Sequence, residues 1–237
     1  MSVTLIEKQI ETPTVCRLSL AVEAPFTYYP GQWIDLFVRR EQHQEVLGVS
    51  LTSAPAADPG QNTRLEIAVK RSAHPVTGYL HDQAQPGDRF EISPQGMGRV
   101  YFEPRLGDEV VLMAGGIGVT PLLSMFRAIR DRFTDTRVTL LYSASTADEF
   151  AFGRELRESA AADARLQVHF FVRADAAEPI PDWVQQRGRI DAAALERLDL
   201  PVLAHYFLCG PQQMLTDLHA LLRQRGVLRE CIHYESW

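Results

Sequence analysis

The chain has 237 residues, of which 46% are hydrophobic and 23% are charged, so it is long enough to bury one large core or two of ordinary size. Its formal net charge of −6 argues against nucleic acid or an anionic membrane surface as the main partner. No run approaches the roughly 20 apolar residues of a membrane helix, and no basic-then-apolar leader opens the sequence, so we expect a cytoplasmic protein without a membrane span.

Short apolar or alternating runs, separated by Pro and Gly turns, fill the first hundred residues. They predict strands over 3–10, 15–22, 32–38, 46–53, 65–70 and 89–93. One short helix is expected over 77–82, with Thr77 as its N-cap. This pattern is typical of a small antiparallel β barrel that the helix closes at one end.

From residue 107 apolar strands alternate with amphipathic helices. Strands are expected over 109–114, 137–142, 166–172, 204–209 and 231–235, and helices over 121–132, 148–159, 191–198 and 211–224. This alternation predicts an α/β domain with a doubly wound parallel sheet. Because Pro104 lies where the two patterns meet, we expect domains at 1–103 and 104–237. Segment 173–189, which holds two prolines, is expected to be a surface excursion.

The most informative stretch joins the first strand of the second domain to its helix. It reads Gly115-Gly-Ile-Gly-Val-Thr-Pro121, with glycines where bare backbone can approach a ligand. Pro121 in the first helical turn gives up an N–H that would be unpaired anyway, and the free N–H groups of a helix start attract anions. The stretch predicts a nucleotide diphosphate site. Pro121 replaces the third glycine of the dinucleotide fingerprint, so a tight turn without a ligand is the alternative on this segment alone.

Metal-binding patterns are missing from the sequence. Cys16, Cys209 and Cys231 are widely spaced and form no C-x-x-C pair, which indicates neither a disulfide framework nor a zinc or iron–sulfur site. The seven histidines show no metal-ligand spacing and are interpreted as surface or capping residues. We therefore expect no metal.

Several motifs together resemble the ferredoxin-NADP reductase superfamily, over nearly the whole chain. They are the Gly-Gly-Ile-Gly-Val-Thr-Pro run, Cys209-Gly-Pro-Gln-Gln-Met214, Pro30-Gly-Gln-Trp33, Val76-Thr77 with Tyr79-Leu80-His81, Leu141-Tyr-Ser-Ala144, and an ending with Glu235 and Trp237. The variant Gly48-Val-Ser50, with Val69-Lys70 and His74-Pro75, looks closest to the branch named oxidoreductase NAD-binding domain-containing proteins.

This resemblance implies a flavin-binding barrel, an NAD(P)-binding α/β domain and hydride transfer between NAD(P)H and flavin across the cleft between them. FAD is expected rather than FMN. The flavin would contact Val49, Ser50, Leu51, Thr52, Ser53, Val69, Lys70, Val76, Thr77 and Trp237. NADH or NADPH would contact Gly115, Gly116, Gly118, Val119, Thr120, Pro121, Ser143, Ser145, Cys209, Gly210, Pro211 and Met214. Ser50, Cys209 and Glu235 are the candidate catalytic residues.

The sequence departs from the superfamily's flavin motif, Arg-x-Tyr-Ser. Leu47 and Val49 stand at the Arg and Tyr positions, which removes a charged phosphate contact and a stacking partner. Lys70 or Arg71 is the candidate replacement for the charge. At Ser145, where superfamily members that bind NADPH often place Arg, a neutral hydroxyl fits either coenzyme, and Arg154 is a candidate for reaching a 2′-phosphate.

Other interpretations remain open for the candidate residues and for the whole chain. Cys209 and Ser50 are also common packing choices on strands, and Glu235 with Trp237 also suits a strand end that caps the core. The expected activity is flavin-dependent NAD(P)H oxidation, with electrons passing to a separate protein or small-molecule acceptor. The alternative is an NAD(P)H-binding regulatory or interaction module that has lost flavin.

Overall fold

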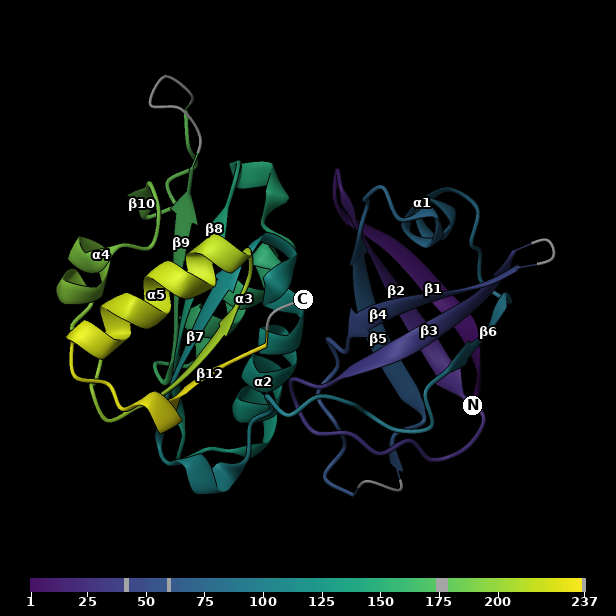
Figure 1. Ribbon diagram of the computed structural model, residues 1–237, viewed down its shortest axis with the longest axis horizontal. Coiled ribbons are helices and arrows are strands. Elements are labelled where there is room, and N and C mark those ends of the chain that lie inside the picture. Colours follow the sequence, from purple (N-terminus) through teal and green to yellow (C-terminus); the bar gives the residue numbers. More distant parts are fainter. Residues whose placement is uncertain (41–42, 59–60, 174–178, 236–237) are drawn as a thin grey trace.

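The protein folds into two lobes that lie side by side, one built on an antiparallel sheet and one on a parallel sheet (Figure 1). The computed structural model describes residues 1–40, 43–58, 61–173 and 179–235. The expected two-part fold class is confirmed, with each lobe formed around its own sheet. We propose that the domain boundary lies between residues 103 and 104, within the connection between the two sheets.

The first lobe is a six-stranded antiparallel barrel with the strand order β4-β3-β6-β1-β2-β5. Its strands are β1 Ser2–Thr12, β2 Val15–Val22, β3 Trp33–Arg40, β4 His43–Ser50, β5 Arg64–Lys70 and β6 Arg89–Ile92. Alternate residues of these strands, such as Leu18, Leu20, Ile34 and Leu36, are fully buried in the barrel core. Helix α1, Pro75–Asp82, covers one end of the barrel, and buried Val76 and Leu80 contribute to its core.

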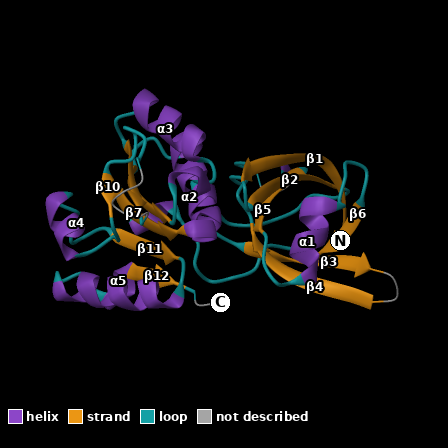
Figure 2. Cartoon of the chain, turned by 90° about the horizontal axis from the view of Figure 1, so that it is seen from above, coloured by secondary structure: helices purple, strands orange, loops and turns teal. Residues whose placement is uncertain are grey.

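The second lobe is a parallel sheet with the order β10-β9-β8-β7-β11-β12. Its strands are β7 Glu109–Gly115, β8 Arg137–Ala144, β9 Leu166–Val172, β10 Gln186–Arg187, β11 His205–Cys209 and β12 Ile232–Tyr234. Helices α2 Val119–Arg132 and α3 Gly153–Ala162 cover one face, and α4 Ala192–Arg197 and α5 Gln212–Gln224 cover the other (Figure 2). Because both faces are covered, β7 and β8 are apolar and buried almost throughout.

The chain order reverses direction across the sheet at β7. The strands β8, β9 and β10 continue outward on one side of β7, and the chain then returns to β11 on its other side. Ligands of open α/β sheets bind in the crevice that such a reversal leaves outside the carboxyl ends of the strands. This crevice lies between the ends of β7 and β11, at Gly115 and Cys209.

Four predicted segments differ from the observed structure. The strand predicted over 46–53 ends at Ser50, because the chain then leaves β3 and crosses to β5, where Leu51 bridges to Ile67.

The helix predicted over 148–159 is broken by Phe152, whose φ of 59° is left-handed, so α3 begins only at Gly153. Helix α1 begins at Pro75 rather than at residue 77, with His74 as its N-cap. The predicted excursion 173–189 includes the short strand β10.

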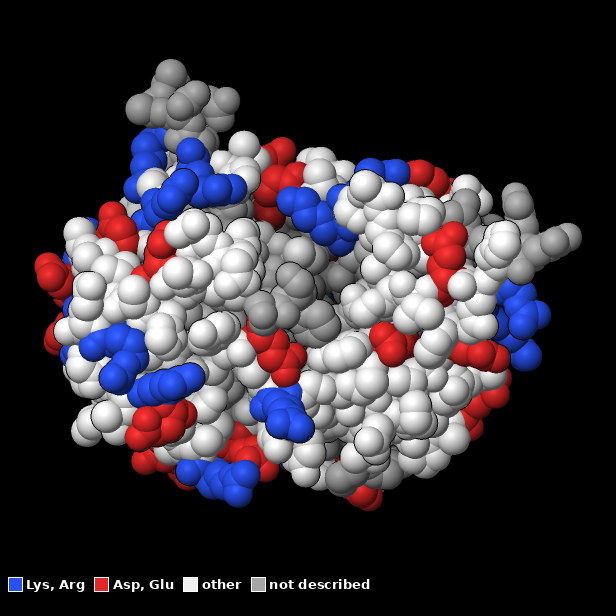
Figure 3. All heavy atoms as spheres, in the orientation of Figure 1, with Lys and Arg blue, Asp and Glu red and all other residues white. Residues whose placement is uncertain are grey.

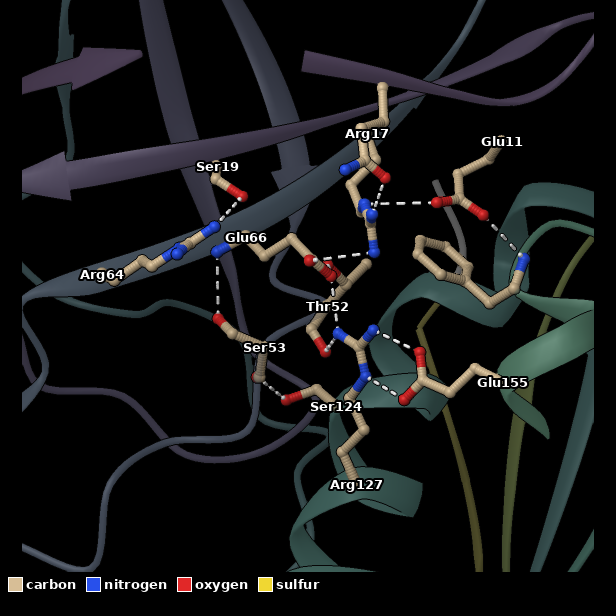
Figure 4. Close-up of polar contacts among 12 residues, drawn as sticks. Glu11, Arg17, Ser19, Thr52, Ser53, Arg64, Glu66, Ser124, Arg127 and Glu155 are labelled. Atoms are coloured by element: carbon tan, nitrogen blue, oxygen red, sulfur yellow. Dashed lines mark hydrogen bonds and ion pairs between the residues drawn. The ribbon is translucent and has the colours of Figure 1, made fainter. Parts of the chain in front are cut away.

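The two lobes are joined by a network of polar contacts around Arg127 on α2 (Figure 4). Its guanidinium donates to the Glu155 carboxylate at 2.6 and 2.8 Å, to Glu66 of the barrel at 2.6 Å and to the Thr52 carbonyl at 3.0 Å. Burial opposes the charged guanidinium, but the hydrogen bonds to Glu155 and the charge of Glu66 outweigh that effect and raise the pKa of Arg127. One turn earlier, the Ser124 hydroxyl donates to the Ser53 carbonyl at 2.6 Å.

In the ranges 1–40, 43–58, 61–173 and 179–235, no helix is both long enough and apolar enough to cross a membrane.

Candidate functional site

The glycine-rich turn after β7 packs directly against the loop that follows β11. A side chain at Gly118 would place its Cβ 2.3 Å from the Cys209 carbonyl oxygen and 2.8 Å from the Gly210 nitrogen. At Gly116, by contrast, φ is 56° and a Cβ would meet nothing within 4 Å. Gly118 is therefore required for packing between the two loops, whereas Gly116 presents bare backbone to open space.

A cavity of about 650 Å³ lies between the lobes and is lined by residues from both. The barrel contributes Val49 and Ser50 at the end of β4, Val69 and Lys70 at the end of β5, and Thr77 on α1. Its opposite wall consists of residues from the two facing loops of the parallel sheet, namely Gly115, Ile117, Gly118, Thr120, Cys209, Gly210 and Pro211. Eleven residues that were predicted to contact flavin or nicotinamide nucleotide therefore line one cavity.

Ser50, Cys209 and Glu235 meet at a smaller cavity of about 20 Å³. The Glu235 carboxylate Oε1 accepts hydrogen bonds from the backbone N–H groups of Arg99, at 2.6 Å, and Val100, at 3.2 Å. Burial, assisted by the negative charge of Glu235, raises the pKa of the Cys209 thiol to about 12. The thiol is therefore protonated at neutral pH, so Cys209 is not an activated nucleophile.

A second large cavity, of about 240 Å³, begins at the glycine turn and extends over the carboxyl end of β8. Gly115, Gly116 and Pro211 line its start, and Ser143 and Ser145 line its far wall. Met214 on α5 also lines it, together with Lys70 from the barrel. Since Gly115, Pro211 and Lys70 belong to both large cavities, an elongated ligand can extend from one into the other.

Comparison with known proteins shows the family to which the chain belongs. The oxidoreductase NAD-binding domain family matches residues 112–220. Oxidoreductase NAD-binding domain-containing protein 1 of Bos taurus is 30% identical over 250 residues, which cover 96% of this chain and 77% of that protein. The chain belongs to the oxidoreductase NAD-binding domain-containing protein family.

Solved structures that are described as binding FAD and NAD or NADP share the fold of this family member. The flavohem-like FAD/NAD binding domain of a Vibrio cholerae nitric oxide dioxygenase superposes with a TM-score of 0.86 at 27% identity, over 100% of this chain and 98% of that one. A ferredoxin NADP+ reductase of Neisseria gonorrhoeae, solved with bound FAD and NADP, shares the fold with a TM-score of 0.78 at 20% identity, over 99% and 97% of the two chains. The resemblance stated from the sequence is confirmed.

In this oxidoreductase family member, several residues that were predicted to contact a cofactor lie outside the two large cavities. Leu51 and Val76 are buried in the barrel core, and Val119 is buried at the start of α2. The Thr52 hydroxyl donates to Glu66 at 2.7 Å, and the Ser53 hydroxyl is bonded to the Tyr28 hydroxyl at 2.9 Å. The Thr52 side chain therefore supports the contact between the lobes through Glu66, which also binds Arg127, and none of these five side chains lines the main cavity. Pro121 lines the small cavity, and Trp237 lies outside the described residues.

Thr77 lines the main cavity but does not cap α1 as the sequence suggested. It lies in the first turn, where its hydroxyl donates to the His74 carbonyl at 2.8 Å and accepts from the Ser72 N–H at 3.0 Å. His74 caps the helix through Nδ1, which accepts from the Val76 N–H at 3.3 Å. The Thr77 hydroxyl therefore holds the loop between β5 and α1 in shape.

Sequence reasoning missed other residues that line the cavities. Arg173 follows β9 and donates from Nη2 to the Ser145 hydroxyl at 2.8 Å, and Arg189 lines the same cavity. No sequence motif marks Arg173, because only the register of β8 and β9 in the folded sheet, which pairs Ala144 with Val172, brings the next residues together. Arg154, the predicted phosphate contact, does not line the cavity, since its side chain is 86% exposed and pairs with Glu158.

Arg71 stands at the mouth of the main cavity. Its guanidinium forms a bidentate pair with the Asp82 carboxylate on α1, at 2.8 and 2.5 Å, and both side chains are exposed. Lys70, beside it, lies 3.9 Å from the Glu149 carboxylate. Both candidate replacements for the missing arginine of the flavin motif therefore line the cavity, each already facing a carboxylate.

The histidines are not all surface residues, contrary to the interpretation of the sequence. His81 is buried, and its Nε2 lies 2.9 Å from the Val69 carbonyl. His205 and His233 stack with ring centroids 5.1 Å apart, and burial lowers the pKa of His233 to about 4. His205 and His233 are half-buried, and His74 caps α1 as the interpretation of surface or capping residues allows. No group of three or more metal-binding side chains occurs in the part of the chain that the structure describes.

Proposed function

We propose that this oxidoreductase family member is a flavin-dependent NAD(P)H oxidoreductase that transfers hydride from NAD(P)H to FAD and then passes electrons to a separate acceptor. The main cavity carries the proposal, because Ser50 and Thr77 from the barrel face Cys209 and Gly118 from the nucleotide-binding lobe across it. The fold similarity to structures described as FAD/NAD-binding supports the same cofactors.

The residues present fit a flavin on the barrel side of this cavity. Val49, Ala68 and Val69 offer an apolar wall, and Lys70 and Arg71 offer positive charge for a diphosphate. Bound flavin supplies a two-electron acceptor that can release electrons singly or in pairs. The side chains of this chain hold and orient the cofactor, with Arg71 and Lys70 in place of the arginine that Leu47 replaces.

The opposite wall fits a nicotinamide nucleotide. Gly116 exposes bare backbone at the start of α2, a helix of 14 residues whose positive end attracts a diphosphate. The neutral Cys209 thiol and Ser50 line the space where nicotinamide and flavin rings would meet. Glu235, anchored on two backbone N–H groups, would hold the end of β12 against that space and so act as a positioning residue.

The final acceptor is a separate protein or a small molecule such as free flavin, quinone or oxygen. Neither the sequence nor the described residues provide a set of ligands for an iron–sulfur cluster, the group that would carry electrons onward within the chain. Cys16, Cys209 and Cys231 are all free thiols, which fits the reducing cytoplasm that we propose as the compartment.

A visible absorption spectrum tests the proposal. The purified chain is incubated with FAD or FMN, desalted, and then mixed anaerobically with NADH or NADPH. We expect a retained yellow band that bleaches on addition of the coenzyme, and an Arg71→Met variant that retains less flavin than the matched surface control Arg154→Met. A yellow protein that neither coenzyme bleaches would contradict the proposed hydride transfer.

The second candidate function is a regulatory or interaction module that binds NAD(P)H and has lost flavin. Leu47 and Val49 favour it, since both line the cavity where superfamily members place the phosphate-binding Arg and the stacking Tyr. A colourless protein after desalting that still binds NAD(P)H would establish this candidate in place of the reductase.

A further inference from the structure

The far end of the second cavity is formed by two parallel strands that end side by side. Ala144 of β8 is in register with Val172 of β9, and the Arg173 N–H donates to the Ala144 carbonyl at 3.0 Å. Ser145 and Arg173 therefore leave the carboxyl edge of the sheet together. The Arg173 guanidinium turns toward this edge and donates to the Ser145 hydroxyl at 2.8 Å.

Positive charge is concentrated at this end of the cavity. Arg173 and Arg189 both line it, and Figure 3 shows Lys and Arg gathered on the surface where Figure 1 places the end of β9 and β10. The Arg173 guanidinium donates this hydrogen bond to a neutral hydroxyl, so an incoming anion does not have to displace a carboxylate from that contact.

The two carboxylates that line the same cavity already have partners. Glu149 Oε2 accepts from the Thr14 hydroxyl at 2.6 Å and lies 3.9 Å from Lys70 Nζ. Asp217 Oδ1 accepts from the Gln213 amide at 2.8 Å. These two carboxylates reduce the positive potential of the cavity, but none of the contacts just described joins them to Arg173 or Arg189.

This end of the cavity lies where the ribose of a dinucleotide would bind. In doubly wound sheets the diphosphate lies at the first strand-to-helix turn, and the adenosine ribose lies at the end of the neighbouring strand. Gly115 and Gly116 line the near end of the cavity, and Ser145 follows β8, the neighbouring strand. A carboxylate at this position favours the free 2′-OH of NADH, whereas arginine accommodates the 2′-phosphate of NADPH.

We propose that Arg173 and Arg189 bind the 2′-phosphate of NADPH, so that this chain uses NADPH in preference to NADH. The inference rests on the proposed function, since it identifies the coenzyme of that same site. Arg173, oriented by Ser145, contacts the phosphate from the end of β9, and Arg189 contacts it from the segment after β10. Arg154 has no part in this recognition, because its side chain lies outside the cavity.

Calorimetric titration of the full chain with 2′,5′-ADP and with 5′-AMP tests the assignment without any need for bound flavin. We expect the wild type to bind 2′,5′-ADP at least about tenfold more tightly, as a charge-assisted contact to one phosphate implies. Arg173→Ser and Arg189→Ser should each reduce this ratio, and the double variant should bring it close to one. Their unchanged affinity for 5′-AMP would show that the site is still folded, and Arg154→Ser should keep the wild-type ratio.

Failure of this inference is distinguishable from failure of the proposed function. Equal affinity of the wild type for the two nucleotides would overturn the 2′-phosphate site and leave nucleotide binding intact. A loss of the ratio in Arg154→Ser as large as that in Arg173→Ser would overturn the assignment to the cavity. Absence of binding for both nucleotides would instead contradict the proposed function, and with it this inference.

Discussion

Arg127→Met should destabilise the protein because it removes the cation at the centre of the contact between the lobes. The guanidinium makes three hydrogen bonds to the carboxylates of Glu155 and Glu66 and one to the Thr52 carbonyl. Methionine occupies much of the same volume, so the change isolates the loss of charge. It leaves two carboxylates, whose side chains are 28% and 16% exposed, without this partner.

The expected loss in the free energy of unfolding follows from the burial of these two carboxylates. Removing one partner of a fully buried ion pair costs about 3–5 kcal/mol. Because Glu155 is partly solvated and also bonded to Arg130 at 3.0 Å, we expect the lower end, about 3 kcal/mol. For a chain of this size the loss corresponds to a fall in Tm of about 6–12 °C. Arg154→Met, at a pair whose side chains are 86% and 70% exposed, should change stability by less than about 1 kcal/mol.

The effect should also depend on pH. The partly buried Glu155 carboxylate is disfavoured by burial, but its hydrogen bonds to Arg127 outweigh this and lower its pKa below 4.5. A lowered folded-state pKa gives stability that is present above the unfolded pKa and is lost as the pH falls through the folded pKa. The difference between wild type and Arg127→Met should therefore be largest above about pH 4.5 and shrink below it.

Urea unfolding followed by far-UV circular dichroism, at about pH 7 and about pH 3.5, measures both effects without adding a salt that screens the ion pairs. A loss of less than about 1 kcal/mol at neutral pH would refute the reasoning, since it would make the network equivalent to an exposed pair. A difference between the two proteins that stays constant across these pH values would show that Glu155 does not stabilise the fold through Arg127.

Three further substitutions test the site. Gly118→Ala should destabilise the protein by about 1–3 kcal/mol and weaken NAD(P)H binding, because the new Cβ would lie 2.3 Å from the Cys209 carbonyl oxygen. Calorimetric titration measures the nucleotide affinity, and an unchanged affinity would contradict this expectation. Cys209→Ala should slow flavin reduction in stopped-flow absorbance while flavin stays bound, and the wild-type thiol, with its pKa near 12, should react with iodoacetamide only slowly at about pH 8. Thr77→Val should loosen flavin and also cost about 1 kcal/mol of stability, since its hydroxyl bonds the loop before α1; equilibrium dialysis and thermal unfolding measure the two effects separately.

Much of the fold could be predicted from hydrophobic periodicity. Five of the six strands described in the parallel sheet were predicted with bounds within two residues of the observed ones, whereas β10, Gln186–Arg187, is polar and was not predicted. Periodicity does not report a single left-handed residue, so the break at Phe152 was not visible. It also does not report where a strand leaves its ladder, and for that reason Leu51, Thr52 and Ser53 were placed on β4 and beside the flavin.

The candidate site could be predicted where short motifs carry it. The glycine turn and the Cys209-Gly-Pro loop do face each other, because both follow strands that lie side by side in the sheet. Arg173 could not be found in this way, since it belongs to no motif and lies 28 residues from Ser145 in the chain. Only the register of β8 and β9 brings the two side chains together, and register depends on the folded sheet.

Helix α2 has a consequence for exchanging domains with other proteins of this fold. Its first residues follow the glycine turn, and Arg127, eight residues and about 12 Å further along, holds Glu66 and Thr52 of the barrel. A chimera that joins this α/β domain to a foreign barrel at residues 103–104 would keep the arginine and lose the Glu66 carboxylate, whereas the acceptor at residue 52 is a main-chain carbonyl that a residue of any type supplies. Such a chimera should regain the native orientation of the two domains only when a carboxylate is also placed at the position of Glu66 in the foreign barrel, where the helix can bind it.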